Sequence, residues 1–465
     1  MRIGRRLLLA VLTFTMLATM CAWSQTPTWT QVPYVNGITW PRFRGWNHMV
    51  YDPTQKKSLY FGGTNDNNGA IYFNSLWAFN STANTWQMLT TSGSNSSLAI
   101  HNCPDQSTTP NEPTDREYYA MSTYDTARKR MWAYGGVCDN IDFTDTWYYD
   151  SSLNTWLQVF PSANPGSRLE SAMVYDPQDD VVILFGGLSG NGGVYNDTWY
   201  YSPSANTWTK ITTTNSPGPR AGEDMVWDPA NKVVVLFGGY HTYYGAALND
   251  VWTYNPVNHT WTQQNPPSSP PGARYPMLAY DSLRSLTTFY SSPGSVWTYS
   301  VGGNQWTQIS TVGGGPPVIS NSQGPEYQTI AWDYDASSDT YVSVDYGGCG
   351  GCTPFVWKLK LGSGASAPPP VQITSPATCS VVSGNVTVTA NAGASAVSVQ
   401  FLLDGSNLGS LETSPPYSVP WSSSSATNGI HQLSAKATDA SSNSGFATAV
   451  PVQVNNNAAN PFKCP

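Results

Sequence analysis

An arginine recurs just before the apolar segments of this sequence that end in an aromatic residue followed by aspartate. The arginines are Arg44, Arg116, Arg168, Arg220 and Arg274, and Pro325 stands at the sixth such position. A guanidinium group can bind a carboxylate or a sugar acid through two parallel hydrogen bonds. It can equally bond backbone carbonyls or a neighbouring repeat. Because the arginine recurs in nearly every repeat, the pattern favours the structural role.

Acidic and aromatic side chains accompany these arginines. The glutamates are Glu117, Glu170, Glu223 and Glu326. They could act as general acid or base partners, or they could neutralise the arginines. The aromatic residues are Trp46, Tyr118, Tyr119, Tyr195, Tyr240, Tyr243, Tyr244 and Tyr275. Exposed aromatic rings with amide groups around them are typical of carbohydrate or protein contacts, although part of this set must serve packing.

Length and composition limit what can position these residues. A chain of 465 residues is too long for one ordinary core, so several domains or one large repeat architecture are expected. Aromatic residues make up 13% of the chain and charged residues only 11%, which is typical of extracellular β proteins. The net charge of −8 argues against nucleic acid, whose binding needs concentrated lysine and arginine.

The N-terminus predicts an export signal. Arg2, Arg5 and Arg6 precede an apolar stretch over residues 7–20, and Ala22 and Ser24 supply the small residues before a cleavage site at Gln25. An uncleaved anchor is the alternative, but the apolar run is short for a membrane span. We therefore predict a signal peptide over residues 1–24. The mature protein is expected to be secreted, periplasmic or on the cell surface, with no membrane span.

One unit recurs along most of the chain. Pairs of tryptophans lie nine residues apart at Trp77 and Trp86, Trp147 and Trp156, Trp199 and Trp208, Trp252 and Trp261, and Trp297 and Trp306. A column of aspartates follows Tyr or Trp at Asp52, Asp125, Asp176, Asp228, Asp281 and Asp333. Glycine pairs lie at 62–63, 135–136, 186–187, 238–239 and 347–348, while the fifth unit has Ser291 and Ser292. Aspartate predicts a tight turn, and glycine predicts a sharp bend or a close approach of backbones.

This pattern resembles the kelch repeat over about residues 27–361, and the resemblance implies an all-β propeller of four-stranded blades. The sixth unit lacks its second tryptophan. Residues 28–32 resemble the missing strand, so they are expected to close blade six and the ring. We therefore predict a six-bladed kelch-type β-propeller over residues 25–361. The blade tryptophans are expected to pack between adjacent sheets.

A second domain follows a linker rich in Gly, Ser, Ala and Pro over residues 362–370. Alternating apolar residues at 385–390 and 398–403, and the Asp404-Gly405 turn signal, indicate half-buried strands. Residues 371–456 resemble a bacterial immunoglobulin-like domain, which implies a β-sandwich that acts as a spacer or adhesive module. Residues 457–465 are expected to form a tail.

Six cysteines remain after signal removal, and an even number in an exported chain indicates disulfides. The kelch resemblance places Cys103 and Cys138 on the same face of the ring, so they are expected to pair. Cys349 and Cys352 are expected to form a local bridge, although a redox motif or part of a zinc site is the alternative. Cys379 and Cys464 are then left to pair with each other.

Taken with the resemblance, these residues predict a non-enzymatic binding module for a glycan or an extracellular protein. No catalytic residue, metal or cofactor is assigned, and the protein is expected to be a monomer. The predicted ligand-binding residues are Arg44, Arg116, Arg168, Arg220, Arg274, Glu170, Glu223, Trp46, His48, Tyr118, Tyr195 and Tyr243. The alternative is a carbohydrate-active enzyme resembling sialic acid epimerases. Copper radical oxidases of the galactose oxidase kind fit less well, because His48, His101, His241 and His259 are scattered.

Overall fold

The computed structural model describes most of the chain between Pro27 and Asn456. The described residues are 27–33, 40–41, 47–65, 71–89, 112–116, 121–138, 141–242, 245–291, 295–313, 315–316, 331–345, 355–361, 369, 371–393, 396–439, 444–447 and 449–456. The predicted signal peptide and tail lie outside them. In the part described, no helix is long and apolar enough to cross a membrane.

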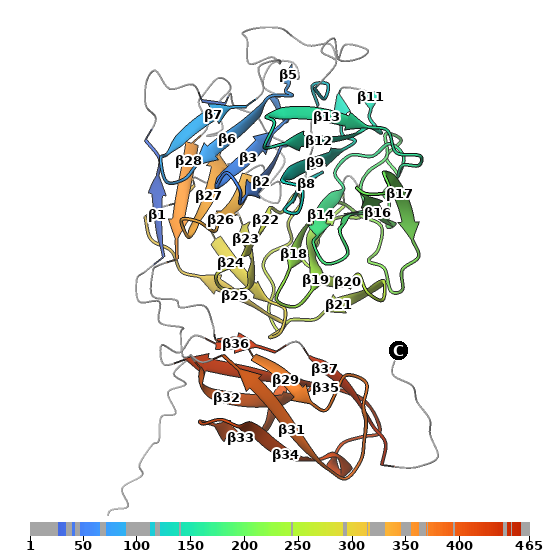
Figure 1. The fold of residues 1–465 in the computed structure, drawn as a ribbon, viewed down its shortest axis with the longest axis vertical. Helices are drawn as coiled ribbons and strands as arrows, with labels where there is room; N and C mark the ends of the chain where they lie inside the picture. The colour runs from blue at the N-terminus through green and yellow to red at the C-terminus, as the bar shows by residue number, and fades with distance from the viewer. Residues whose placement is uncertain are drawn as a thin grey trace, which may run out of the picture.

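Six four-stranded antiparallel sheets form the first part of the chain and surround a common centre (Figure 1). Blade one contains β2 (His48–Asp52), β3 (Lys57–Phe61), β6 (Leu76–Asn80) and β7 (Thr85–Met88). Blade two contains β8 (Ser122–Asp125), β9 (Arg130–Tyr134), β12 (Thr146–Asp150) and β13 (Thr155–Val159). Blade three contains β14 (Ala172–Asp176), β15 (Val181–Phe185), β16 (Thr198–Ser202) and β17 (Thr207–Ile211).

The other three blades repeat this order. Blade four contains β18 (Ala221–Asp228), β19 (Val233–Tyr240), β20 (Val251–Asn255) and β21 (Thr260–Gln264). Blade five contains β22 (Leu278–Asp281), β23 (Leu286–Ser291), β24 (Ser295–Ser300) and β25 (Gln305–Ile309). Blade six contains β26 (Ala331–Asp335), β27 (Thr340–Asp345), β28 (Phe355–Lys360) and β1 (Thr28–Gln31). The predicted six-bladed fold is therefore confirmed.

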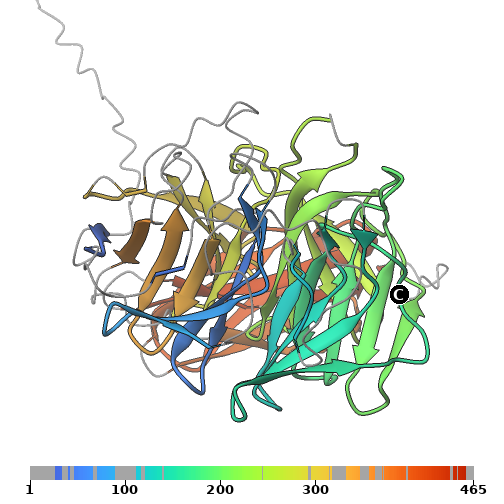
Figure 2. The same cartoon turned by 90° about the horizontal axis from the view of Figure 1, so that it is seen from above.

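Two small hairpins extend from the ring: β4 (Thr64–Asn65) with β5 (Ile71–Tyr72), and β10 (Val137–Cys138) with β11 (Ile141–Asp142). Figure 2 shows the strands of the propeller from above, standing side by side.

We call the segment just before the first strand of a blade its lead-in segment. The loop face is the face that carries the lead-in segments and the loops after the second strands.

Strand β1 closes the ring. It pairs with β28 in antiparallel register, with Trp29 opposite Leu359, so the N-terminal strand is the outer strand of a blade made from the other end of the propeller. The backbone N–H of Val32 donates a further bond to Val356 O at 2.8 Å. A three-stranded blade six would leave β28 as an unpaired edge.

The outer-strand tryptophan of each blade is the main contact between neighbouring blades. In blades two to six it packs on the aromatic residue that directly precedes the glycine pair of the preceding blade, or Ser291 in blade five. The ring-centroid distances are 4.5 Å for Phe61 and Trp156, 5.1 Å for Tyr134 and Trp208, 4.8 Å for Phe185 and Trp261, 5.1 Å for Phe237 and Trp306, and 5.7 Å for Tyr290 and Trp29. Each such ring stabilises the ring of blades through area burial and aromatic packing.

Four of the six third-strand tryptophans are less buried than those of the outer strands. Trp199, Trp252, Trp297 and Trp357 are only half-buried, whereas all six outer-strand tryptophans are at most 6% exposed. The prediction that the tryptophans pack between sheets therefore holds for the outer strands and for the buried third-strand Trp77 and Trp147, which are 0% and 5% exposed, but not for the other four. The residue two positions after each third-strand tryptophan, such as Tyr254, pairs across the strands with the outer-strand tryptophan.

The turn after the first strand depends on the aspartate column. Asp176 Oδ1 accepts the backbone N–H of Gln178 at 2.8 Å, which is the capping bond expected of an Asx turn. In blade six the turn residue is Asp335, which accepts Ser337 N–H at 2.9 Å. The assignment of Asp333 to this column is wrong, because the repeat there reads Asp-Tyr-Asp and the first aspartate lies within β26.

The second domain has its own core. One sheet contains β29 (Val371–Ser375), β31 (Asn385–Ala392) and β34 (Tyr417–Ser422). The other contains β30 (Val381–Val382), β37 (Val450–Val454), β35 (Gly429–Asp439), β32 (Ala396–Leu403), β33 (Ser406–Glu412) and β36 (Ser444–Phe446). A short 3-10 turn, η1 (Ser423–Ser425), follows β34. Val388, Val399, Phe401 and Leu433 are each 0% exposed between the sheets, as expected for an immunoglobulin-like sandwich.

Cysteines are described at two positions. Cys138 and Cys379 are both disulfide-bonded. Cys103, Cys349, Cys352 and Cys464 lie outside the described residues. The three pairings therefore stay predictions.

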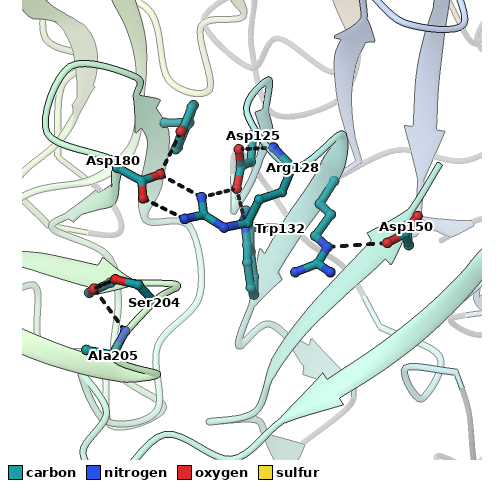
Figure 3. Close-up of polar contacts among 10 residues, drawn as sticks. Asp125, Arg128, Trp132, Asp150, Asp180, Ser204 and Ala205 are labelled. Carbon is teal, nitrogen blue, oxygen red and sulfur yellow. Dashed lines mark hydrogen bonds and ion pairs between the residues drawn. The ribbon is translucent and has the colours of Figure 1, made fainter. Parts of the chain in front are cut away.

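Two ion-pair clusters join blades on the face opposite the loop face. Arg128 of blade two donates to Asp180 of blade three, and to Asp125 at 3.0 Å (Figure 3). Arg284 of blade five repeats the arrangement, with Asp281 at 2.8 Å and Asp339 of blade six at 2.7 Å. The Arg284 side chain is 2% exposed, whereas that of Arg128 is 26% exposed.

The first prediction concerns ring closure. Replacing Trp29 by Ala removes a side chain that is 4% exposed and packed on Tyr290 and Trp332. We expect the free energy of unfolding to fall by about 3–5 kcal/mol, measured by denaturant unfolding. The neighbouring exposed residue offers a control, Thr30→Ala, which should change stability by less than about 0.5 kcal/mol. Equal stability of Trp29→Ala and Thr30→Ala would refute the closure contact.

The second prediction compares the two ion-pair clusters. Arg284→Met should cost about 3–5 kcal/mol, because it removes the cation that pairs with the buried carboxylate of Asp281. Arg128→Met should cost about 1 kcal/mol, because solvent screens the more exposed pair. Burial opposes ionisation of Asp339, but the Arg284 guanidinium holds its pKa below the ordinary value. This contribution is therefore present above the ordinary carboxyl pKa and lost as pH falls. A larger loss for Arg128→Met would contradict the burial argument.

Candidate functional site

The glycine pairs after the second strands bring neighbouring blades together at the loop face. Gly186 and Gly187 have φ of +67° and +102°, which L side chains rarely adopt. A Cβ on Gly186 would lie 2.8 Å from the carbonyl oxygen of Arg220 and would overlap the carboxyl of Glu223. Only glycine allows blade four to approach this closely.

A belt of backbone hydrogen bonds follows from these glycines. The second glycine of a pair donates its N–H to the carbonyl of the lead-in segment of the next blade. The bonds are Gly63 to Arg116 at 3.2 Å, Gly136 to Arg168 at 3.2 Å, Gly187 to Arg220 at 2.9 Å and Gly239 to Ala273 at 2.9 Å. These bonds hold each lead-in segment against the glycine pair of the preceding blade. They therefore position the lead-in side chains that were predicted to bind a ligand.

The arginines of blades two, three and four bond within their own blades. Arg220 donates to Gly238 O at 3.1 Å and to both carboxylate oxygens of Asp250 at 2.8 Å. Arg116 bonds Gly135 O and Asp145 in the same way, and Arg168 bonds Gly186 O and Asp197. Each of these three arginines is at most 1% exposed. Their guanidinium groups hold the glycine turn to the third strand, which is the structural role.

The aspartates of these ion pairs precede the third-strand tryptophan by two positions. The indole N–H groups of Trp147, Trp199 and Trp252 donate to Asp145, Asp197 and Asp250 at 2.7, 2.8 and 2.7 Å. Burial disfavours ionisation of Asp197 and Asp250, but the guanidinium beside each lowers its pKa overall. Sequence reasoning missed these three aspartates, although the repeated Asp-X-Trp motif could have revealed them.

Arg274 differs because blade five has Ser295 at the position of the aspartate, and Ser291 follows its second strand in place of the first glycine. Its guanidinium carbon lies 4.5 Å from the centre of the Tyr240 ring of blade four, and it donates to Gly245 O. Arg274 therefore reaches across to the neighbouring blade.

Glu170 lies at the meeting point of blades three, four and five. Its carboxylate accepts the hydroxyls of Tyr240, in β19, and of Tyr275, in the lead-in segment of blade five, the latter at 3.0 Å. Burial raises the pKa of Glu170 to about 7, against the two tyrosine hydroxyls and Arg274, which lower it. The glutamate is 8% exposed.

Glu223 lies beside this cluster and is 0% exposed. Within the described part of the chain, neither of its carboxylate oxygens has a hydrogen-bond partner. Burial raises its pKa well above the ordinary value, the Arg220 guanidinium opposes that shift, and the charge of Glu170 adds to it. Burial without a hydrogen-bond partner therefore disfavours the ionised form of this side chain.

Three more buried titratable side chains lie on first strands. His48 Nδ1 is 2.8 Å from Ser122 Oγ of blade two, and burial lowers the pKa of this histidine to about 4. Asp224 accepts the N–H groups of Met225 and, from blade five, Leu278, both at 2.7 Å, and burial raises its pKa to about 8. Burial raises the pKa of Asp333 to about 7. His48 is therefore a neutral link between blades one and two.

The remaining predicted ligand residues fall in two groups. Tyr195 is half-buried, with its ring centre 4.2 Å from the Arg168 guanidinium carbon. Arg44, Trp46, Tyr118 and Tyr243 lie outside the described residues. Over the ranges that the structure covers, no group of three or more His, Cys, Asp or Glu side chains is arranged to hold a metal ion.

Comparisons with known proteins agree with this architecture. The KLHDC2/KLHL20/DRC7 Kelch-repeats domain matches residues 160–324, and the Bacterial Ig domain matches residues 369–435.

The chain is similar to three proteins among others. A Paenibacillus xyloglucanase is 28% identical over 44% of this chain and 21% of its own length. Kelch domain-containing protein 3 of Rattus norvegicus is 24% identical over 29% of this chain and 38% of its own length. Human multiple epidermal growth factor-like domains protein 8 is 28% identical over 32% of this chain and 6% of its own length. The chain thus spans well under half of each of these relatives. It consists of a kelch-repeat β-propeller followed by a bacterial immunoglobulin-like domain.

Proposed function

We propose that this chain is an exported, non-enzymatic binding protein whose loop face binds a neutral glycan. Kelch and immunoglobulin-like domains are typical of binding and interaction modules, and bacterial immunoglobulin-like domains are typical of extracellular or surface proteins. The similarity to a xyloglucanase supports a plant-type neutral polysaccharide as the ligand class. The second domain then acts as a spacer or adhesive module.

The observation that carries this proposal is the internal neutralisation of the loop-face arginines. Arg116, Arg168 and Arg220 each face an aspartate and a glycine carbonyl of their own blade, so their charge is matched inside the protein. An acidic sugar would need guanidinium groups that can leave these bonds, at the cost of an unpaired buried carboxylate. A neutral sugar needs only hydroxyl, amide and aromatic partners.

Exposed polar side chains of this kind lie on the described part of the loop face. Asn191 follows the second strand of blade three, and His241 and Thr242 follow that of blade four. Tyr195 offers a half-buried ring beside the arginine of its blade. Trp46, Tyr118 and Tyr243 stay predicted ligand contacts.

Burial of the acids supports binding over catalysis. A general acid or base must come within hydrogen-bond distance of the reacting group. Glu223 is 0% exposed, and the carboxylate of Glu170 is occupied by two tyrosine hydroxyls. Glu117 and Glu326, the other acids considered from the sequence, lie outside the described residues.

The third prediction tests the ligand class. The mature chain is titrated calorimetrically with xyloglucan oligosaccharides and, separately, with sialic acid, each at low and high salt. We expect binding of the neutral sugar with little dependence on salt, because no charge pairing contributes. We also expect no release of reducing ends during incubation. Salt-sensitive binding of sialic acid alone, or hydrolysis of xyloglucan, would refute the proposed function.

The fourth prediction tests the location. His241→Ala and Asn191→Ala should each weaken xyloglucan binding by about threefold to tenfold, the loss expected for one exposed hydrogen bond. Gln158→Ala, on the exposed outer strand of blade two, is the matched control and should bind as the wild type does. Unchanged affinity in both loop variants would place the ligand elsewhere.

A further inference from the structure

The lead-in segment of blade four is held firmly where it meets the loop after β19. Pro217 and Pro219 each have the fixed φ of proline. The next residue, Arg220, donates its backbone N–H to Tyr195 O of blade three at 2.9 Å, and its guanidinium group bonds both carboxylate oxygens of Asp250 at 2.8 Å. These constraints give the carbonyl group of Pro219 a fixed direction.

The imidazole ring of His241 lies against this segment. Its Nδ1 is 2.6 Å from Pro219 O, and a carbonyl oxygen only accepts, so Nδ1–H donates this bond. The ring also lies over Gly218, where a Cβ would come within 3.0 Å of Cε1, 3.6 Å of Nδ1 and 3.8 Å of Nε2. The preceding residue, Tyr240, is 0% exposed and anchors the backbone. The ring is therefore held in one orientation by its own blade.

This contact determines which nitrogen of His241 faces a ligand as an acceptor. A neutral imidazole carries a proton on one nitrogen only. Because Nδ1 carries that proton, Nε2 keeps its lone pair. His241 is exposed, and within the described part of the chain no hydrogen bond joins Nε2 to another residue. A ligand group that bonds Nε2 must therefore supply the proton.

The proton requirement distinguishes between classes of ligand group. A hydroxyl group has a proton to donate, whereas an ionised carboxylate only accepts. The nearby cation does not favour an anion either, because the charge of Arg220 is matched by Asp250. The neutral form of His241 thus fits a hydroxyl group and does not fit an acidic one.

We propose that His241 is a specificity-determining residue of the loop face, whose Nε2 accepts a hydrogen bond from a sugar hydroxyl while Pro219 and Gly218 fix the tautomer and orientation of its ring. The assignment rests on the proposed glycan function and names the acceptor within that site. A side chain held in its binding orientation loses little conformational freedom when the ligand arrives. The lead-in segment that holds it also bonds Tyr195 O, so it joins the imidazole to the backbone of blade three.

The fifth prediction concerns the tautomer of the ligand-free protein. The mature chain is labelled with ¹⁵N-histidine and studied by NMR at about pH 8, above the range in which histidine gains its second proton. The whole chain has five histidines, so the spectrum of His241→Gln assigns the signals of His241 by difference. We expect a protonated Nδ1 and an unprotonated Nε2. A proton on Nε2 in place of Nδ1 would overturn the proposal, whether or not xyloglucan binds.

The same labelled chain is then saturated with xyloglucan oligosaccharides. The Nε2 signal should move upfield but stay in the unprotonated range, as expected of a nitrogen that accepts a hydrogen bond. An unchanged Nε2 signal in the sugar-bound protein would overturn the role of His241. Failure of the wild type to bind xyloglucan, with the Nδ1–H tautomer present, would refute the proposed function and the ligand role of His241 with it.

A pair of variants with similar side-chain shape isolates the acceptor. His241→Gln keeps a carbonyl oxygen, whereas His241→Met lacks a strong acceptor. We expect calorimetry to show xyloglucan affinity within about threefold of the wild type for His241→Gln, and a further loss of at least about threefold for His241→Met. Thr262→Ala, exposed on β21 of the same blade, is the control and should bind as the wild type does. Equal affinity of the glutamine and methionine variants would contradict an acceptor role.

Discussion

The contact between an outer-strand tryptophan and the preceding blade is the interaction on which the rest of the propeller depends. Strand register places this tryptophan opposite the aromatic residue of its own third strand, as with Tyr254 and Trp261 at 4.8 Å. The opposite side of the same ring packs on the residue before the glycine pair of the previous blade, as with Phe185. A blade therefore completes its core only with a neighbour, which is the behaviour expected of repeat architectures. The N-terminal strand supplies the contact that the sixth repeat lacks.

The loop face follows from this packing. Because each second strand ends against the next blade, the following turn needs two glycines, and the arginine of the lead-in segment ties that turn to the third strand. The charge of the arginine is matched by an aspartate in blades two, three and four. Blade five has Ser295 at the position of this aspartate, and there the Arg274 side chain packs on Tyr240 of blade four. The irregular blade thus creates the place where Glu170, Tyr240 and Tyr275 meet.

The repeat spacing predicted the fold well because it is a local signal. Tryptophans nine residues apart, a turn aspartate and a glycine pair mark each blade, and the incomplete sixth unit indicated how the ring closes. The partners of the arginines were not predictable in the same way, since Arg220 and Asp250 are separated by a whole strand pair whose register the sequence does not show. The same reason explains why Asp333 was assigned to the turn in place of Asp335. His48 was predicted to bind a ligand, but it is buried and bonds Ser122. The sequence did not show this because the contact joins residues of two different blades.

The central claim is that the loop-face arginines of blades two to four are internal, so that the ligand is neutral and bound by polar and aromatic groups around them. A crystal structure of the mature chain with a xyloglucan oligosaccharide tests this claim most directly. The account predicts sugar density near Asn191 and His241, with Arg116, Arg168 and Arg220 still paired to Asp145, Asp197 and Asp250. A sugar in direct contact with those guanidinium groups, with the aspartates displaced, would contradict it.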